Sequence, residues 1–463
     1  MKFPEYKNKK VLIAGLGLYR QGSGISAAKF FVKNGARVTV TDLKTRRELA
    51  SSLRELKSYK ITYVLGKHRK QDFKDTDIVV KNPGMRRNSS YIATARKAGV
   101  RIESDITIFF KHCPARIIGV TGTRGKSTTA AFIYEMLKKK KTAFLGGNIK
   151  VSPLNFLGRI KSSDWAVIEL SSWMLEDLGD KKTSPHIAVV TNVMRDHLNA
   201  YPNMRAYERA KAMIFKYQSP EDYVVLNRDN KVTREFGKRV LSQRFWFSSK
   251  LFKEENGAMA RAGRVIFRDD GRVWNVAARK DILLLGEHNL YNALAATCVA
   301  KILRVPCATV RSALKSFKGL ESRQQLIAIK QGIKYYNDTT ATTPDAGMAA
   351  LKTLGRGKNI ILIAGGADKK LIFKDWARQV KKYTKAAILF KGAASKKMAK
   401  ELAKNKVNIT GQVGSMPKAV KLARDCAKRG DIVLLSPAAA SFGLFLNEFN
   451  RGDRFVRAVR AVR

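Results

Sequence analysis

The chain lacks two features that would assign it to a membrane or to a secreted, disulfide-linked class. None of its apolar runs approaches the roughly 20 residues that a membrane span needs. Its N-terminus passes from a short basic stretch directly into a strand-like segment with no cleavage site, so we expect no signal peptide. The four cysteines, Cys113, Cys298, Cys307 and Cys426, are scattered and form no C-x-x-C pair. We therefore expect reduced thiols in a cytoplasmic protein.

Histidine and acidic residues are also scarce. The five histidines are too scattered to suggest a zinc site. The chain has only 37 acidic residues but 90 lysines and arginines. The resulting net charge of +53 attracts anions, among them nucleotides and RNA. Because the basic residues are spread along the whole chain, they are more typical of solvated helix faces than of a nucleic-acid site. We expect only weak, salt-sensitive RNA binding, and we keep a basic nucleic-acid-binding protein as an alternative function.

The pattern of strands and helices predicts three α/β domains, at residues 1–113, 114–319 and 320–463. A length of 463 residues suits about three domains. In each segment apolar strands alternate with helical stretches, which is typical of parallel, doubly wound sheets. We expect Rossmann-like first and third domains and a second α/β sheet in the central domain. Short strands and turns between residues 222 and 279 predict a β insertion in the central domain.

The strongest local motif is GVTGTRGKSTT, residues 119–129. An apolar strand precedes its glycines and a helix follows them, so backbone N–H groups and the helix N-terminus can hold phosphate oxygens. Lys126 can reach the outer phosphates, and the Ser127 hydroxyl can bind Mg²⁺. Val120 stands where the longer phosphate-loop pattern has glycine, so this is the shorter Gly-Thr-x-Gly-Lys-Ser form. The motif predicts a nucleotide site.

A second glycine-rich loop, residues 15–24, also lies between a strand and a helix. Asp42 ends the next strand, where a dinucleotide-binding fold has its ribose-binding acid. The dinucleotide pattern G-x-G-x-x-G would need glycine at Arg20, and the loop is too long for it. A nucleotide-diphosphate site and a simple packing turn both stay open.

Three further polar residues accompany the strands and helices near the phosphate loop. Glu169 ends an apolar strand, where it is suited to bind Mg²⁺, with a helix cap as the alternative. His197 follows the end of another strand of the same predicted sheet, so we expect it at the same sheet edge as Lys126 and Glu169. Lys211 lies in a helical stretch, where a lysine is ordinarily a surface residue.

Taken in order, these motifs resemble the Mur ligase family, and within it the D-glutamate-adding branch. The matching residues span nearly the whole chain. They are the first glycine loop with Asp42, Asn82-Pro83-Gly84, TGTRGKST, Gly146-Gly147-Asn148, Glu169-Leu170-Ser171-Ser172, NVMRDH, Lys211, His288-Asn289 with Asn292, Arg323, Asn337-Asp338, Gly365-Gly366 with Asp368-Lys369, and SPAAASFGLF.

The resemblance implies an ATP-dependent carboxylate–amine ligase of peptidoglycan biosynthesis. Its substrates would be ATP, UDP-N-acetylmuramoyl-L-alanine and D-glutamate, and a monomer is expected. The first domain would hold the UDP-linked substrate, the central domain, of the P-loop ATPase type, would hold ATP, and the third domain would hold the amino acid. ATP would phosphorylate the acceptor carboxylate, and the amine of D-glutamate would then attack the acyl phosphate.

The resemblance also implies a role for each matching residue. Lys126, His197 and Lys211 are the implied catalytic residues. Two Mg²⁺ ions are implied, the first held by Ser127 and Glu169 and the second by His197 and a carbamylated Lys211. The implied ATP-binding residues are Gly122, Thr123, Gly125, Lys126, Ser127, Thr128, Asn289, Asn292, Arg323 and Asp338. The implied substrate-binding residues are Gly15, Gly17, Asp42, Asn82, Asn148, Thr342, Lys369, Ser441 and Phe442.

Three positions depart from the family's pattern. Thr340 stands where lysine is expected, Ser322 where histidine is common, and Glu448 where an aromatic residue usually comes. All three belong to the nucleotide or amino-acid end of the site. A related ligase that adds another amino acid therefore stays open as an alternative function.

Overall fold

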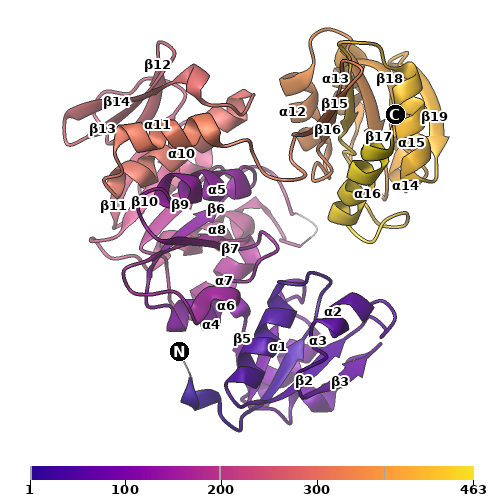
Figure 1. Cartoon of the computed structure of the whole chain (residues 1–463). Helices are drawn as coiled ribbons and strands as arrows, with labels where there is room; N and C mark the ends of the chain where they lie inside the picture. Colours follow the sequence, from indigo (N-terminus) through magenta and orange to yellow (C-terminus); the bar gives the residue numbers. More distant parts are fainter. Residues whose placement is uncertain (1–2, 198–199, 370, 463) are drawn as a thin grey trace. The chain divides into compact units, whose positions relative to one another are not determined.

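The computed structural model describes residues 3–197, 200–369 and 371–462, which form two compact units (Figure 1). The first unit runs to Leu283 and adds His288–Phe317, and the second comprises Leu284–Glu287 and the chain from Lys318 onward. The first unit holds two sheets and the second holds one. Most neighbouring strands are parallel, which confirms the α/β class, while domain boundaries at residues 113 and 319 stay a prediction. Among the described residues, no helix has the length and apolar character needed to cross a membrane.

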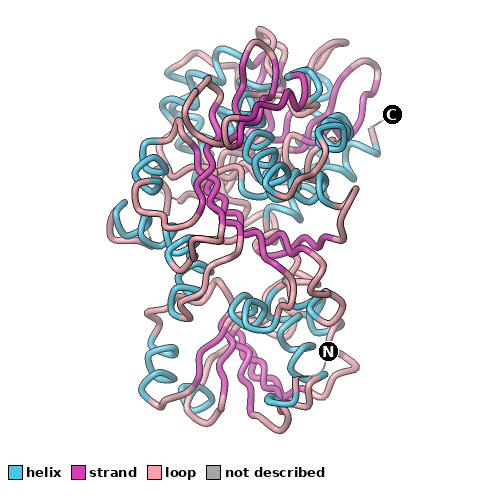
Figure 2. The backbone as a smooth tube through the Cα atoms, turned by 90° about the vertical axis from the view of Figure 1, so that its left-hand side faces the viewer, coloured by secondary structure: helices cyan, strands magenta, loops and turns pink. Residues whose placement is uncertain are grey.

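The first sheet has the strand order β3-β2-β1-β4-β5, and its neighbouring strands are parallel. Helices α1 and α4 pack on one face and α3 on the other, so both faces are covered and the strands are apolar. Figure 2 shows helices on both sides of the strands in this part of the chain. The elements of this region are η1 (Pro4–Tyr6), β1 (Lys10–Ala14), α1 (Ser23–Lys33), β2 (Arg37–Asp42), α2 (Ala50–Arg54), β3 (Ile61–Leu65), η2 (Lys70–Phe73), β4 (Ile78–Lys81), α3 (Ser90–Lys97), β5 (Arg101–Glu103) and α4 (Asp105–His112).

The central sheet has the order β14-β13-β12-β11-β10-β9-β6-β8-β7. The predicted β insertion is part of this sheet, because β10 and β11 continue it in parallel and β13 and β14 add antiparallel strands. Its elements are β6 (Arg116–Thr121), α5 (Lys126–Leu137), β7 (Ala143–Gly147), α6 (Leu154–Leu157), β8 (Trp165–Glu169), α7 (Ser172–Asp180), β9 (Ile187–Val190), α8 (Met204–Lys216), β10 (Tyr223–Asn227), α9 (Lys231–Gly237), β11 (Gln243–Ser248), β12 (Gly257–Arg261), β13 (Arg264–Asp269), β14 (Arg272–Ala278), η3 (Arg279–Asp281), α10 (Glu287–Ile302) and α11 (Cys307–Ser316).

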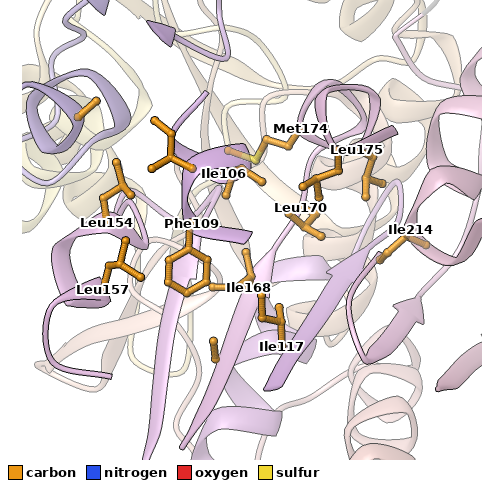
Figure 3. Close-up of a cluster of buried hydrophobic side chains, with 14 of the residues drawn as sticks. Ile106, Phe109, Ile117, Leu154, Leu157, Ile168, Leu170, Met174, Leu175 and Ile214 are labelled. Atoms are coloured by element: carbon orange, nitrogen blue, oxygen red, sulfur yellow. The ribbon is translucent and has the colours of Figure 1, made fainter. Parts of the chain in front are cut away.

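A continuous apolar core joins the first two sheets into one unit (Figure 3). Ile106 and Phe109 of α4 lie in the same buried cluster as Leu154 of α6 and Ile168 of β8. Burial of such side chains is worth roughly 1.5–3 kcal/mol each. Helix α4 therefore ties the segment before residue 113 to the central sheet.

The second unit has the sheet order β15-β16-β20-β17-β18-β19, in which only the pairing of β15 with β16 is antiparallel among the described strands. Helices α12, α13 and α14 cover one face, and α15 and α16 cover the other. The elements are β15 (Gln325–Lys330), β16 (Ile333–Asn337), α12 (Pro344–Leu354), β17 (Ile360–Ala364), α13 (Lys374–Tyr383), β18 (Thr384–Phe390), α14 (Ala393–Lys404), β19 (Ile409–Val413), α15 (Met416–Cys426), β20 (Ile432–Leu435) and α16 (Glu448–Ala461).

All four cysteines are free thiols. Cys298 is buried, as expected of a core thiol, whereas Cys113, Cys307 and Cys426 are only partly buried.

Candidate active site

The phosphate loop connects β6 to α5 and depends on two glycines. Gly122 and Gly125 have φ angles of +149° and +84°, which side chains rarely adopt. A Cβ atom on Gly125 would lie 2.3 Å from Asn292 Oδ1, and one on Gly122 would lie 1.9 Å from Thr191 Oγ1. Glycine thus lets the loop backbone approach its neighbours closely while α5 begins at Lys126 with its N-terminus toward the loop.

Neighbouring elements hold this loop in shape. Asn192, just after β9, accepts the Arg124 backbone N–H on its Oδ1 at 2.9 Å and the Thr123 N–H on its carbonyl oxygen at 2.9 Å. Asn292 of α10 accepts a hydrogen bond from Thr129 Oγ1 at 3.2 Å and donates to Asn289 Oδ1 at 3.1 Å. The structure therefore brings the predicted residues Asn289 and Asn292 to the phosphate loop.

Glu169 ends β8 next to β6, and its carboxylate is 1% exposed. Asn148, which follows β7, donates its side-chain amide to Glu169 Oε1 at 3.0 Å. Within the described part of the chain, the other oxygen, Oε2, is buried and has no hydrogen-bond partner. A buried carboxylate oxygen in that state is costly unless a cation or a donor reaches it.

Lys211 is buried, so the expectation of a surface lysine from its helical context is wrong. Its side chain is 1% exposed, with Nζ 3.4 Å from Thr121 Oγ1 and 4.8 Å from the centre of the Tyr207 ring. Burial lowers the pKa of Lys211 well below its ordinary value, and the positive charge of Lys126 lowers it further. The negative charges of Asp196 and Glu169 act in the opposite direction but are outweighed. The signal was available in the sequence, because Lys211 lies in the apolar stripe of α8 at helical spacing from Tyr207 and Ile214.

His197 lies in the loop after β9 with a left-handed φ of +55°. Its ring lies 5.1 Å from the Trp173 ring and 5.8 Å from the Tyr207 ring. Burial lowers the pKa of His197, and the positive charges of Lys126 and Lys211 lower it further. The negative charge of Asp196 raises the pKa and is outweighed. The imidazole is therefore kept in its neutral, ligand-competent form.

These residues fit a hydrated cation better than an all-protein metal cage. The described residues contain no group of three or more His, Cys, Asp and Glu side chains arranged to hold a metal. Three groups could bind the cation: Glu169 Oε2, which has no hydrogen-bond partner among the described residues, the buried Ser127 side chain and the neutral His197 ring. Mg²⁺ is commonly held by one or two carboxylates together with phosphate oxygens and water, which matches this sparse set.

The residues predicted around the first glycine loop meet at the carboxyl edge of the first sheet. Asp42 Oδ2 accepts the backbone N–H groups of Leu16 at 2.8 Å and Gly17 at 3.4 Å, and Asn82 donates to the Gly15 carbonyl at 3.3 Å. Gly15 and Gly17 both have positive φ angles. Asp42 thus shapes the loop, in addition to any contact that it makes with a ligand.

In the second unit, Asp338 lies at the centre of a buried polar cluster after β16. Its carboxylate accepts the Gln324 backbone N–H at 3.2 Å and the Ser436 hydroxyl at 2.8 Å. Arg451 of α16 is 0% exposed and donates to Thr339 Oγ1 and O and to the Ala439 carbonyl. Sequence reasoning missed Arg451, which joins the loop after β16 to the loop after β20.

The other predicted residues of this unit follow the same strands. Ser441 is buried, Phe442 is 62% exposed and Lys369 is exposed. Ala438 N donates to the Ala341 carbonyl, and Ala367 pairs with Ala440, so the loops that carry Thr342, Lys369 and Ser441 adjoin one another. Arg323 lies next to the Asp338 cluster, and its positive charge partly offsets the rise that burial causes in the pKa of Asp338. The structure places Arg323 and Asp338 in the second unit, and Asn289 and Asn292 in the first.

Asp338 should make the free energy of unfolding depend on pH. Burial raises the pKa of Asp338 to about 7, although the hydrogen bonds from Ser436 and Gln324 stabilise the carboxylate and lower the pKa. A carboxyl whose pKa is higher in the folded chain binds more protons there, so stability falls as pH rises from about 4 to about 7. We expect Asp338→Asn to gain stability relative to the unsubstituted protein over that range, by up to about 1.4 kcal/mol per pH unit in urea unfolding. A stability difference that does not change with pH would contradict this effect.

Family models match the chain in three consecutive parts. Residues 9–104 match the MurD-like N-terminal domain of Mur ligases, residues 120–300 the Mur ligase middle domain, and residues 322–439 the glutamate ligase domain of Mur ligases. Together they cover most of the chain, in the order that the motifs predict.

Named relatives and solved structures agree with these matches. The chain is 42% identical to UDP-N-acetylmuramoylalanine–D-glutamate ligase of Roseiflexus sp. (strain RS-1), over 98% of each chain, and 37% identical to the enzyme of that name from Acetivibrio thermocellus, over 98% and 97%. The fold is similar to the crystal structure of UDP-N-acetylmuramate-alanine ligase MurC from Thermotoga maritima, with a TM-score of 0.66, 21% identity and coverage of 98% and 100%. The chain therefore belongs to the Mur ligase family.

Proposed function

We propose that this chain is an ATP-dependent ligase that joins D-glutamate to UDP-N-acetylmuramoyl-L-alanine in peptidoglycan biosynthesis, in the cytoplasm. The observation that carries the proposal is the grouping of Lys126, Glu169, His197 and Lys211 around one phosphate loop. Phosphate and carboxylate groups repel each other, so a site that joins them needs fixed positive charge and few competing waters. The names of the relatives support D-glutamate as the incoming amino acid.

The reaction has two bond exchanges. An oxygen of the acceptor carboxylate attacks the γ-phosphorus of ATP, and the bond to the β–γ bridging oxygen breaks to release ADP. The amine of D-glutamate then attacks the acyl carbon, the adduct expels phosphate, and the nitrogen loses a proton to leave an amide. Lys126, at the start of α5 with Nζ 3.2 Å from the Thr123 carbonyl, is suited to neutralise the transferred phosphoryl group.

Two Mg²⁺ ions would supply further positive charge to the phosphate oxygens. Ser127 and Glu169 would hold the first ion, and His197 and Lys211 the second. Lys211 would become an anionic oxygen ligand once its neutral amine forms a bond to the carbon of CO₂ and releases a proton, which gives a carbamate. Burial and the lowered pKa of Lys211 support this modification, because they favour the neutral amine.

We propose that residues 1–113 hold the UDP-linked acceptor, 114–319 hold ATP, and 320–463 hold D-glutamate. Exposed Lys369 is a suitable partner for an amino-acid carboxylate, and the adjoining loops carry Thr342, Ser441 and Phe442. Gly15 and Gly17 belong to the loop proposed for the UDP group, and Asp42 and Asn82 bond to its backbone.

The proposal is tested by phosphate release from ATP with UDP-N-acetylmuramoyl-L-alanine, Mg²⁺ and bicarbonate, with and without D-glutamate. We expect release that requires D-glutamate and is lost in a Lys126→Ala variant. Absence of release with every amino acid tried would overturn the proposal for this acceptor.

A ligase for another amino acid is the second candidate function. It is supported by the three departures from the family's pattern, at Thr340, Ser322 and Glu448. They are linked in the structure: Thr340 Oγ1 donates to the Ser322 carbonyl at 2.9 Å, and Thr339 Oγ1 donates to the Glu448 carbonyl at 2.7 Å. The same assay with L-alanine, L-glutamate and a diamino acid separates the two functions.

A further inference from the structure

The second unit has a groove on its α15–α16 face, and none of its lining residues belongs to the loops proposed for substrate binding. It has a volume of about 690 Å³ and lies between the two helices. Val420 and Ala458 belong to its apolar floor, and both belong to or pack against the core beneath these helices. This volume is large enough to hold a small ligand or a row of side chains from one face of a partner helix.

Both walls have the same helical spacing. On α15 the groove is lined by Pro417, Val420, Lys421 and Arg424, which are related as i, i+3, i+4 and i+7. On α16 it is lined by Arg454, Arg457, Ala458 and Ala461, with the same relation. Each set forms one stripe of a helix, so the groove runs along the two helices and can accept a third helix between them.

The walls carry an excess of positive charge. Lys421, Arg424, Arg454 and Arg457 line the groove, and Asp425 is the one acidic residue among its lining residues. Arg424 NH1 lies 3.7 Å from Asp425 Oδ1, while Arg454 lies over the Phe445 ring at 5.7 Å. The groove therefore combines an apolar floor with cations on both walls.

We propose that this groove docks an amphipathic helix of a partner protein, with small apolar residues on one face and Glu or Asp along its flanks. Such a helix would cover the Val and Ala floor and place its acids beside both cationic walls, as in other helix-in-groove complexes. Nucleic acid suits the groove less well, since its lining residues include no aromatic side chain on which a base could stack.

The test uses the full-length protein and a fluorescein-labelled synthetic helical peptide of about 18 residues. The peptide has leucine and alanine on one face and glutamate on its flanks, and its comparator has the same composition in scrambled order. Fluorescence anisotropy measures both affinities, with an oligodeoxynucleotide as competitor. We expect the scrambled peptide to bind about tenfold or more weakly.

Paired variants separate the groove from the general charge of the protein. Arg454→Glu with Arg457→Glu reverses one wall, and Lys421→Glu with Arg424→Glu reverses the other. Lys382→Glu with Lys400→Glu makes the same charge change on α13 and α14, which cover the opposite face of the sheet. Circular dichroism and thermal unfolding verify that each variant is folded.

We expect either groove variant to weaken peptide binding about tenfold or more and the opposite-face variant to leave it nearly unchanged. Ala458→Gln, which fills the floor without changing the charge, should also weaken it. Equal binding of ordered and scrambled peptides, equal losses in all charge variants, or displacement of the peptide by the oligonucleotide at matched charge would each overturn the proposal.

Discussion

Replacing Lys211 by methionine is expected to lower the ligation rate about a hundredfold to a thousandfold, the effect of removing one charge-stabilising group from such a site. Methionine keeps much of the side-chain volume but cannot form a carbamate. Removing a buried amine leaves no unpaired partner charge, so the free energy of unfolding should not fall. Phosphate release and urea unfolding on the same samples distinguish lost chemistry from lost folding.

The carbamate itself has a separate readout. Wild-type activity should fall in CO₂-depleted buffer and recover with bicarbonate, and [¹³C]bicarbonate should give a carbamate NMR signal that is absent from Lys211→Met. Lys216→Met is the matched control, because Lys216 is an exposed lysine on the same helix. Wild-type activity in Lys211→Met, or an unchanged carbamate signal, would disprove the assignment.

Replacing Glu169 by glutamine is expected to raise the Mg²⁺ concentration needed for half-maximal activity by about tenfold or more. The substitution preserves the size of the side chain but removes the charge of the buried carboxylate whose Oε2 lacks a hydrogen-bond partner in the described structure. If Glu169 had only a structural role, the substitution would change stability and leave the Mg²⁺ requirement unaltered. The measurement is phosphate release as a function of Mg²⁺ at fixed ATP.

Asp105 offers a closely matched control. It is also 1% exposed, accepts a hydrogen bond from Ser152 at 2.7 Å, and has a second oxygen without a hydrogen-bond partner among the described residues. It begins α4, between the first and central sheets. Asp105→Asn should leave the Mg²⁺ requirement unchanged, and an equal shift in both variants would rule out a specific metal role for Glu169.

Local sequence predicted the regular elements well where chain neighbours determine them. The segment RVTVTD forms β2, residues 37–42, and the helix expected after the first glycine loop is α1. The phosphate loop was predictable because a strand, two glycines and a helix start are adjacent along the chain. The strands β10 and β11 looked like an insertion, since sequence alone does not say which sheet a strand joins.

The two residues that sequence reasoning misjudged share one feature. Lys211 and Arg451 are cations within the apolar stripes of α8 and α16, aligned with Ile214 and Phe455 respectively. A cation at such a position is buried only if the neighbouring element provides polar atoms for its head group. Thr121 does so for Lys211, and Thr339 and Ala439 do so for Arg451.

The sequence by itself determined the α/β class, the phosphate loop and the order of the motifs, because each depends on residues close together along the chain. Only the tertiary structure decided that Glu169 Oε2 is buried without a hydrogen-bond partner among the described residues, and that burial lowers the pKa of Lys211 and raises the pKa of Asp338. Burial and the nearby charges set these properties, and both depend on residues that are distant in sequence and adjacent only after folding.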